Sequence, residues 1–248
     1  MDRLAYVAMT GAKQIEAAQA ITANNLANVS TVGFRADLHE FSQVPVEGAG
    51  YATRVNAVTE YGSVDFRSGA TQSTGRQLDI AVSGEGFLAV QAPDGTEGYT
   101  RAGNLKIGTG GILTTAGGLP VLGDGGPVAV PPNESLAIGR DGTVTVRPLG
   151  QGTEALAVVD RLKLVRPDAG ELVKGSDGLL RLASGAPAPA DATVTVQSGV
   201  LESSNVNIAQ TLVSMIELAR QYEGQINVIK NAEDNADAAA ALLRSPSV

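Results

Sequence analysis

Apolar side chains recur at alternating spacings of four and three residues near both ends of the chain. Toward the N-terminus this pattern predicts a helix over about residues 2–28. Toward the C-terminus it predicts a longer helix over about residues 207–244, with Asn207 and Gln210 as a capping pair. The first stripe comprises Leu4, Ala8, Gly11, Ile15, Ala18, Thr22, Asn25 and Val29; the second comprises Ile208, Leu212, Met215, Ala219, Tyr222, Ile226 and Ile229 and continues through Glu233 to Leu243.

Heptads sustained over this length are typical of a helix with a coiled-coil-like partner. The N-terminal stripe is rich in small residues, so another helix can approach closely, but little area is buried per turn. The pattern leaves open whether the two helices pair within one chain or between chains.

The residues between the helices are rich in turns. Of the 30 glycines, 27 lie between Gly48 and Gly199, and all 11 prolines lie at or after Pro45. Asp-Gly pairs at 94–95, 124–125, 141–142 and 177–178 predict hairpin turns. We also expect a tight reversal at 84–86 and an exposed loop over 184–191.

These patterns together predict an α+β fold in two domains. Long N- and C-terminal helices, residues 1–35 and 204–248, would form a coiled-coil-like inner domain. Residues 36–203 would form a central, mostly antiparallel β domain.

The composition excludes several kinds of chemistry. The chain has no cysteine, one histidine and a net charge of −8, so thiolate sites and paired-histidine metal sites are absent, and nucleic acid is not an expected partner. His39 is interpreted as a solvated loop residue, and the glycine-rich stretches 108–111 and 123–126 as hairpin loops. The acidic residues are interpreted as a solvated surface, and the spacing of Asp79, Glu85 and Asp94 does not favour a hydrolase. We therefore expect no catalytic, metal or cofactor-binding residue, and no enzyme.

The sequence contains no apolar run of the roughly 18 residues that would span a membrane. Its first residues lack the basic and apolar regions of a cleaved signal peptide. We expect a cytosolic protein or one exported without such a signal.

The segment from Ala23 to Arg35 has an unusual composition, with asparagines at positions 24, 25 and 28. Gly33 fits a helix stop, because glycine readily adopts the left-handed conformation that ends helices. The three carboxamides are less easily explained on a heptad helix, and they could hydrogen-bond across a helix interface.

This segment, Ala23-Asn24-Asn25-Leu26-Ala27-Asn28-Val29-Ser30-Thr31 followed by Gly33-Phe34-Arg35, resembles the N-terminal signature of bacterial flagellar rod and hook proteins. The stretches 78–87, 99–103 and 118–123 are similar to the central β domain of that family. The stretch 201–207, with 215–217 and 220–223, is similar to its C-terminal helix. The opening residues 1–4 and 9–14 and the short length most resemble the proximal rod member, and the distal rod member is the alternative.

The resemblance implies a structural subunit of the flagellar basal body that assembles into a helical tube and transmits torque from rotor to hook and filament. Its implied partners are copies of itself, other proximal and distal rod proteins and the flagellar type III export apparatus. No nucleic acid and no direct membrane insertion are expected, and the implied location is the periplasmic part of the rod. An exported soluble binding module that dimerises through its helices remains a second hypothesis.

We expect subunit assembly to depend on the two helical stripes and the asparagine-rich segment. These residues are Leu4, Ala8, Gly11, Ile15, Ala18, Thr22, Asn24, Asn25, Leu26, Asn28, Gly33, Phe34, Ile208, Leu212, Met215, Ala219, Tyr222, Ile226 and Ile229.

Overall fold

The structure is a computed structural model that describes residues 2–45, 55–150 and 156–244. The chain divides into two compact units. A helical unit is drawn from Met1–Ala27, Asp37–Ser63 and Asn207–Val248, and a β body from Asn28–Ala36 and Val64–Val206. Each unit is described on its own below.

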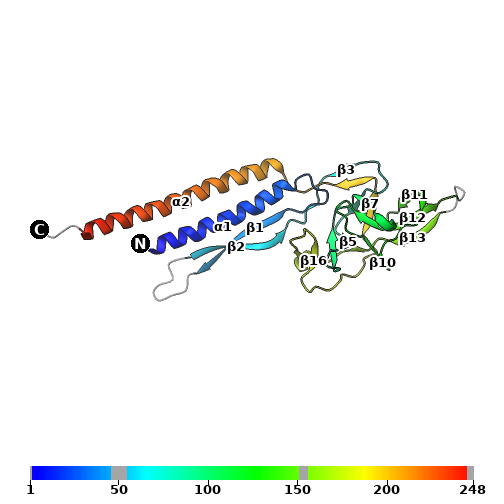
Figure 1. Cartoon of the computed structure of the whole chain (residues 1–248), viewed down its shortest axis with the longest axis horizontal. Helices are drawn as coiled ribbons and strands as arrows, with labels where there is room; N and C mark the ends of the chain where they lie inside the picture. Colours follow the sequence, from blue (N-terminus) through cyan, green and yellow to red (C-terminus); the bar gives the residue numbers. More distant parts are fainter. Residues whose placement is uncertain (1, 46–54, 151–155, 245–248) are drawn as a thin grey trace. The chain divides into compact units, whose positions relative to one another are not determined.

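The helical unit contains the two predicted helices, α1 (Asp2–Ala27) and α2 (Ile208–Arg244). The two helices run side by side (Figure 1). The Asn207 Oδ1 atom accepts a hydrogen bond from the Gln210 amide at 3.1 Å, which satisfies a free donor at the start of α2 as the sequence predicts. Over the described residues, neither helix combines the length and apolar character needed to cross a membrane.

Two strands, β1 (Asp37–Pro45) and β2 (Val55–Val64), form a two-stranded sheet along α1 (Figure 1). The sequence analysis assigns residues 37–63 to the β domain, whereas they lie in the helical unit. His39 lies on β1 and is half-buried, so its interpretation as a solvated loop residue was wrong. Conversely, residues 28–35 and 204–206 were expected in the helical domain and lie in the β body.

The β body is built from short strands whose registered pairs are antiparallel, as predicted. The largest sheet has the order β14-β5-β6-β16-β15 and a second sheet the order β11-β12-β13, while β4 pairs with β17, β3 with β18, β7 with β8 and β9 with β10. The strands are β3 (Thr71–Ser73), β4 (Ile80–Ser83), β5 (Phe87–Gln91), β6 (Glu97–Thr100), β7 (Leu105–Ile107), β8 (Leu113–Thr115), β9 (Leu122–Gly123), β10 (Gly126–Pro127), β11 (Asn133–Ile138), β12 (Thr143–Pro148), β13 (Ala157–Arg161), β14 (Leu164–Val165), β15 (Leu172–Lys174), β16 (Leu180–Leu182), β17 (Thr195–Ser198) and β18 (Val200–Glu202), with short 3-10 turns at Thr109–Gly111 and Ala169–Glu171.

The β body has its own apolar core. One buried cluster includes Ile80, Leu88, Leu113 and Val144, and a second surrounds Tyr99. The Tyr99 hydroxyl accepts a hydrogen bond from a buried backbone amide, and burial raises the pKa of Tyr99 to about 12. Large apolar side chains are thus removed from water within this unit, and their burial stabilises it.

The predicted Asp-Gly turns are confirmed, since they connect β5 to β6, β9 to β10, β11 to β12 and β15 to β16. The stretch 84–86 differs from a simple reversal. It carries the chain from β4, which pairs with β17, to β5, which pairs with β6 and β14. A Cβ atom at Gly86 would lie 2.6 Å from Val194, so the packing there requires glycine.

The predicted exposed loop over 184–191 is exposed at most positions, but Asp191 is half-buried and Ala188 is buried. That residue is buried because its amide donates to the Tyr99 hydroxyl at 2.6 Å. Sequence spacing does not connect Ala188 with Tyr99, so the burial of this loop residue could not be predicted.

Candidate assembly surface and chain junction

The predicted stripe on α1 faces α2 of the same chain. Ala8, Ile15, Ala18 and Thr22 are buried, and Ile15 and Ala18 pack against Leu218 of α2. A Cβ atom at Gly11 would lie 3.3 Å from the Gln225 side chain, so glycine permits a close approach there. Leu4 lies on α1, but its side chain is outside the described residues.

The predicted stripe on α2 is covered only in part within the single chain, and the expected assembly role of its residues stays a prediction. Met215, Tyr222 and Ile229 are half-buried, as is Ile226. The alternate row lies one residue earlier than predicted, because Leu218 and Ala232 are buried where Ala219 and Glu233 were expected. The observed row also includes the half-buried polar residues Thr211 and Gln225, and it leaves Ile208, Leu212 and Ala219 exposed. The predicted continuation ends at Leu243, whose side chain lies outside the described residues.

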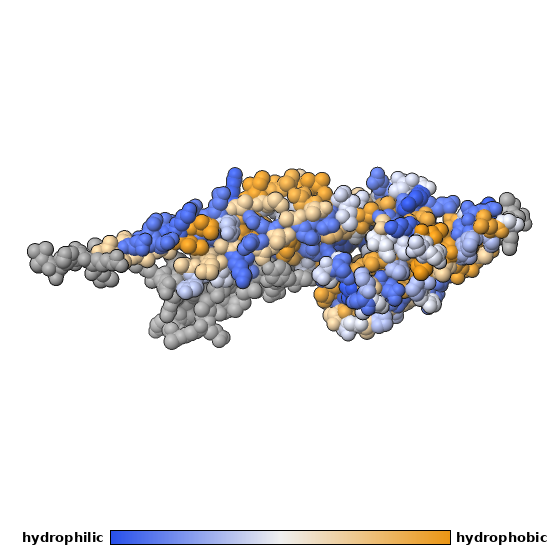
Figure 2. All heavy atoms as spheres, in the orientation of Figure 1, coloured by the Kyte–Doolittle hydropathy of each residue, from blue (hydrophilic) through white to orange (hydrophobic). Residues whose placement is uncertain are grey.

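This rotation leaves an apolar stripe on the outside of α2, which we call the α2 patch: Ile208, Leu212, Val213 and Ile216. These side chains are 44–56% exposed. Apolar side chains gather over the N-terminal half of α2 in Figure 2. On α1, Tyr6 and Met9 are also exposed, whereas the face turned toward α2 is mostly alanine. Several large apolar side chains of this helix pair are therefore exposed together, which is typical of an interaction surface.

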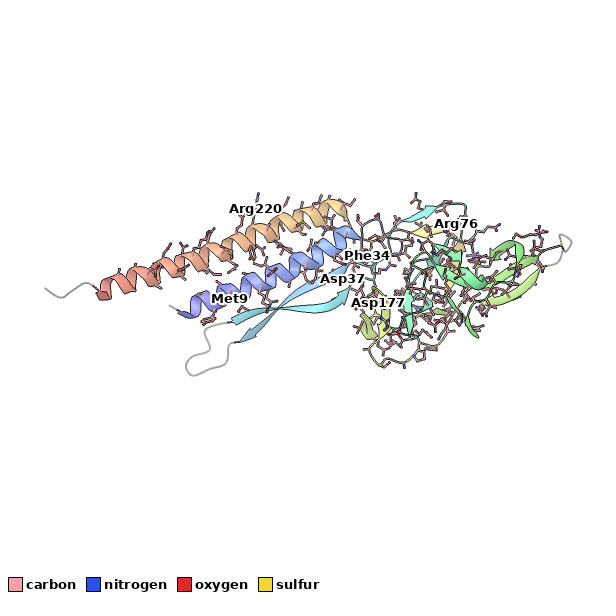
Figure 3. The ribbon with its side chains drawn as sticks, viewed as in Figure 1. Met9, Phe34, Asp37, Arg76, Asp177 and Arg220 are labelled. Carbon is pink, nitrogen blue, oxygen red and sulfur yellow. The ribbon has the colours of Figure 1, made fainter. Side chains whose placement is uncertain are left out.

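The charged side chain of Arg220 is exposed and projects from α2 on the side away from α1 (Figure 3). Arg220 follows the α2 patch along the helix, where the exposed side chains become polar.

The asparagine-rich segment has a local role in the structure. The Asn25 side chain accepts a hydrogen bond from the Asp37 amide at 2.9 Å and donates one to the Asp37 carbonyl at 2.8 Å. This pair fixes the start of β1 to the last turn of α1. Asn28 accepts a hydrogen bond from the Thr31 hydroxyl at 3.1 Å in the turn after the helix. Asn24 is exposed and Leu26 is half-buried.

Gly33 and Phe34 lie in the β body. Gly33 has a φ of 68°, and a Cβ atom there would lie 2.2 Å from the Arg101 carbonyl carbon, so no other residue fits without displacement. The Lys174 ammonium lies 4.0 Å from the centre of the Phe34 ring and donates to the Arg35 carbonyl at 2.9 Å. The expected assembly role of Gly33 and Phe34 stays a prediction.

Arg35 introduces a buried charge cluster that the sequence analysis missed. The Glu202 carboxylate is 2% exposed and receives Arg35 at 2.6 Å and Arg101 at 3.0 Å. Arg101 also donates to the Val82 carbonyl, and its burial lowers its pKa despite the nearby carboxylate.

The interpretation of the acidic residues as a solvated surface was therefore wrong for Glu202. It was also wrong for Asp79, which is buried and accepts a hydrogen bond from Arg76 at 3.0 Å. Arg35 and Glu202 both stand in stretches that carry the family resemblance. Nothing in the spacing of these stretches, however, pairs Arg35 with a residue 167 positions away. Among the described residues, no group of three or more histidine, cysteine or acidic side chains could hold a metal ion.

Comparison with protein families gives three matches in chain order. "Flagella basal body rod protein" matches residues 6–35, "Flagellar hook protein FlgE/F/G D1 domain" matches 81–146, and "Flagellar basal body rod FlgEFG protein C-terminal" matches 197–242. The chain belongs to the flagellar basal-body rod protein family.

Individual relatives define the subgroup. The chain is 42% identical to the flagellar basal-body rod protein FlgF of Salmonella typhimurium and 43% identical to that of Escherichia coli, over 98% of this chain and 99% of each relative. It is 30% identical to FlgG of Bacillus subtilis, over 94% of this chain and 96% of the relative. The chain is thus a FlgF-like rod protein, a structural subunit of the basal body in a family not known to be enzymatic.

Proposed function

We propose that this chain builds the proximal rod by packing the outer faces of its helical unit against neighbouring rod subunits. The observation that carries the proposal is the α2 patch, together with exposed Tyr6 and Met9 on α1. A monomer gains nothing from large apolar side chains in water, whereas a neighbour that covers them removes that area from solvent.

Repetition of one such contact along an axis generates the assembly. A patch that packs against a different surface of the next copy makes a heterologous contact, and such contacts form an open helical tube when they do not close a ring. In a tube of this kind torque from the rotor is distributed over many helix contacts toward hook and filament. We propose further that the subunit reaches the periplasmic part of the rod through the flagellar type III apparatus, without a cleaved signal peptide.

The two rows of assembly residues then have different tasks. The buried row, with Ala8, Ile15 and Ala18, holds α1 against α2 within the subunit. The outward residues Ile208 and Leu212, which the sequence analysis also selected, would contact neighbouring subunits. Other rod proteins, proximal and distal, are the proposed neighbours.

Substitution of Ile216 by aspartate tests the proposal. Ile216 is 56% exposed, so Ile216→Asp should fold normally, but it places a carboxylate where the neighbouring subunit would remove water. We expect loss of incorporation into basal bodies and loss of swimming when the variant replaces the wild-type gene. The matched control is Ile107→Asp on β7 of the β body, where the isoleucine is 43% exposed. Normal swimming and incorporation of Ile216→Asp would refute the assignment of the α2 patch.

A further inference from the structure

The chain passes between its two units four times, after residues 27, 36, 63 and 206. Each passage is a single covalent connection. In a subunit that carries torque, force would enter the β body through these connections. The structure shows how their ends are held within the β body.

On the β-body side, three of these four connections are joined to one another by a closed set of hydrogen bonds. The Ala36 amide donates to Asn205 Oδ1 at 2.8 Å, and the Asp65 amide donates to the Ala36 carbonyl at 2.8 Å. The Asn205 carboxamide in turn donates to the carbonyls of Asp65, at 2.8 Å, and Arg67, at 3.0 Å. One carboxamide thus uses both its acceptor and its donors to connect two other chain segments.

The segment that enters after residue 27 is attached to the same set. The Gly33 amide donates to the Glu202 backbone carbonyl at 2.8 Å, and the Phe34 carbonyl accepts from the Asn205 amide at 3.3 Å. The Glu202 carboxylate binds Arg35, and the same Oε1 atom accepts from the Gly69 amide at 3.0 Å.

Glu202 also anchors this set to the interior of the β body. Its second oxygen binds Arg101, whose guanidinium donates to carbonyls at the end of β4 and lies 5.2 Å from the centre of the Phe87 ring in the core. A buried ion pair of this kind is costly to break, because removal of one partner leaves an uncompensated charge. Within the β body, the four segments that lead to the helical unit are therefore bonded to each other through Asn205 and to the core through Glu202.

We propose that Glu202 and Asn205 form a mechanical joint, which makes the four connections between the two units resist force together instead of one at a time. The purpose of the joint rests on the proposed rod function, whereas its resistance to force is a property of the isolated chain. Bonds that share a load in parallel rupture at higher force than the same bonds loaded in succession.

Single-molecule force measurement on the full chain tests the joint. The sequence has no cysteine, so cysteines introduced at the exposed positions Gln210 and Thr109 attach handles without side reactions. The test variant is Asn205→Asp, which keeps the acceptor for Ala36 and removes both donated hydrogen bonds. At roughly 1 kcal/mol for each lost bond, we expect the segment around residue 205 to detach at least roughly tenfold faster at a given force.

The matched control is Asn133→Asp. Asn133 also donates to a backbone carbonyl, that of Pro131 at 2.8 Å. It lies on β11 and is not part of the four connections between the units. We expect its detachment rate to equal that of the wild type. Equal rates for Asn205→Asp and Asn133→Asp would overturn the joint.

Hydrogen exchange of the wild type keeps the proposal testable if Asn205→Asp does not fold. The joint requires the amides of Ala36 and Asp65 to be protected and to open together. Exchange of either amide at the rate of an unstructured peptide would overturn it. Failure of Ile216→Asp to block rod assembly would refute the proposed role of the α2 patch and leave both of these measurements unaffected.

Discussion

Leu218 provides a quantitative test of how α1 and α2 pack. Its side chain is 5% exposed and contacts Ile15 and Ala18. Leu218→Ala removes three carbon atoms at about 0.8 kcal/mol each, or about 2.4 kcal/mol in transfer free energy. The cavity adds to this, because the surrounding alanines are too small to fill it. We therefore expect a loss of about 3 kcal/mol, within the range of about 2.7–5 kcal/mol found for buried leucines.

Native-state hydrogen exchange of the α2 amides measures this loss directly. A global unfolding curve is less suitable, because the two units need not unfold in one transition. The control is Leu212→Ala, the same change on the same helix at a side chain that is 44% exposed. We expect it to cost about 1 kcal/mol or less. Equal losses at the two positions would show that α2 does not face α1 through Leu218, and would refute the rotation described above.

Two further predictions concern the β body. Gly33→Ala should lower its midpoint of thermal unfolding far more than Gly84→Ala: both glycines have positive φ, but an added Cβ collides with backbone only at Gly33 and meets open space at Gly84. Equal shifts would contradict the close approach of residue 33 to Arg101. The pKa of Tyr99 is raised to about 12 in the folded state by burial, so the unfolded state loses its proton first as pH rises. The contribution of Tyr99 to stability is thus fully present below about pH 10 and is lost between about pH 10 and pH 12; Tyr99→Phe should abolish this part of the pH dependence in denaturant titrations.

The sequence predicts the two helices and the Asp-Gly turns because local chemistry decides them. Proline-free heptads determine α1 and α2 almost to the residue, and Asn207 caps α2 as its side chain suggests. The family resemblance also rests on local motifs, each of which can be identified without knowledge of distant contacts.

The orientation of α2 could not be predicted in the same way. Two rows, one through Leu218 and one through Ala219, share Met215 and Tyr222 and differ by a single residue elsewhere. The choice depends on which row α1 fits, and that is a tertiary contact. Since both rows carry apolar residues, a heptad count alone cannot say which one faces inward and which one is left for a neighbour.

The buried charge cluster was missed for a related reason. Arg35, Arg101 and Glu202 are ordinary charged residues in the sequence, far apart from one another. Charged side chains are solvated in most proteins, so burial is expected only where partners are identified. Here the partner of Arg35 is 167 residues away, and periodicity gives no information over such a separation.

The distribution of large apolar side chains explains why neighbouring residues of α2 should affect different properties. The β body encloses leucine, valine, isoleucine and tyrosine in its own core. The helix pair encloses mainly alanine with Ile15 and Leu218, and leaves Leu212 and Ile216 outside. Burial of alanine yields little free energy per residue, so we expect neighbours that cover the outside to contribute much of the order of the helical unit. Leu218 should therefore determine the stability of the subunit, whereas Ile216, two residues away, should determine whether the subunit joins the rod.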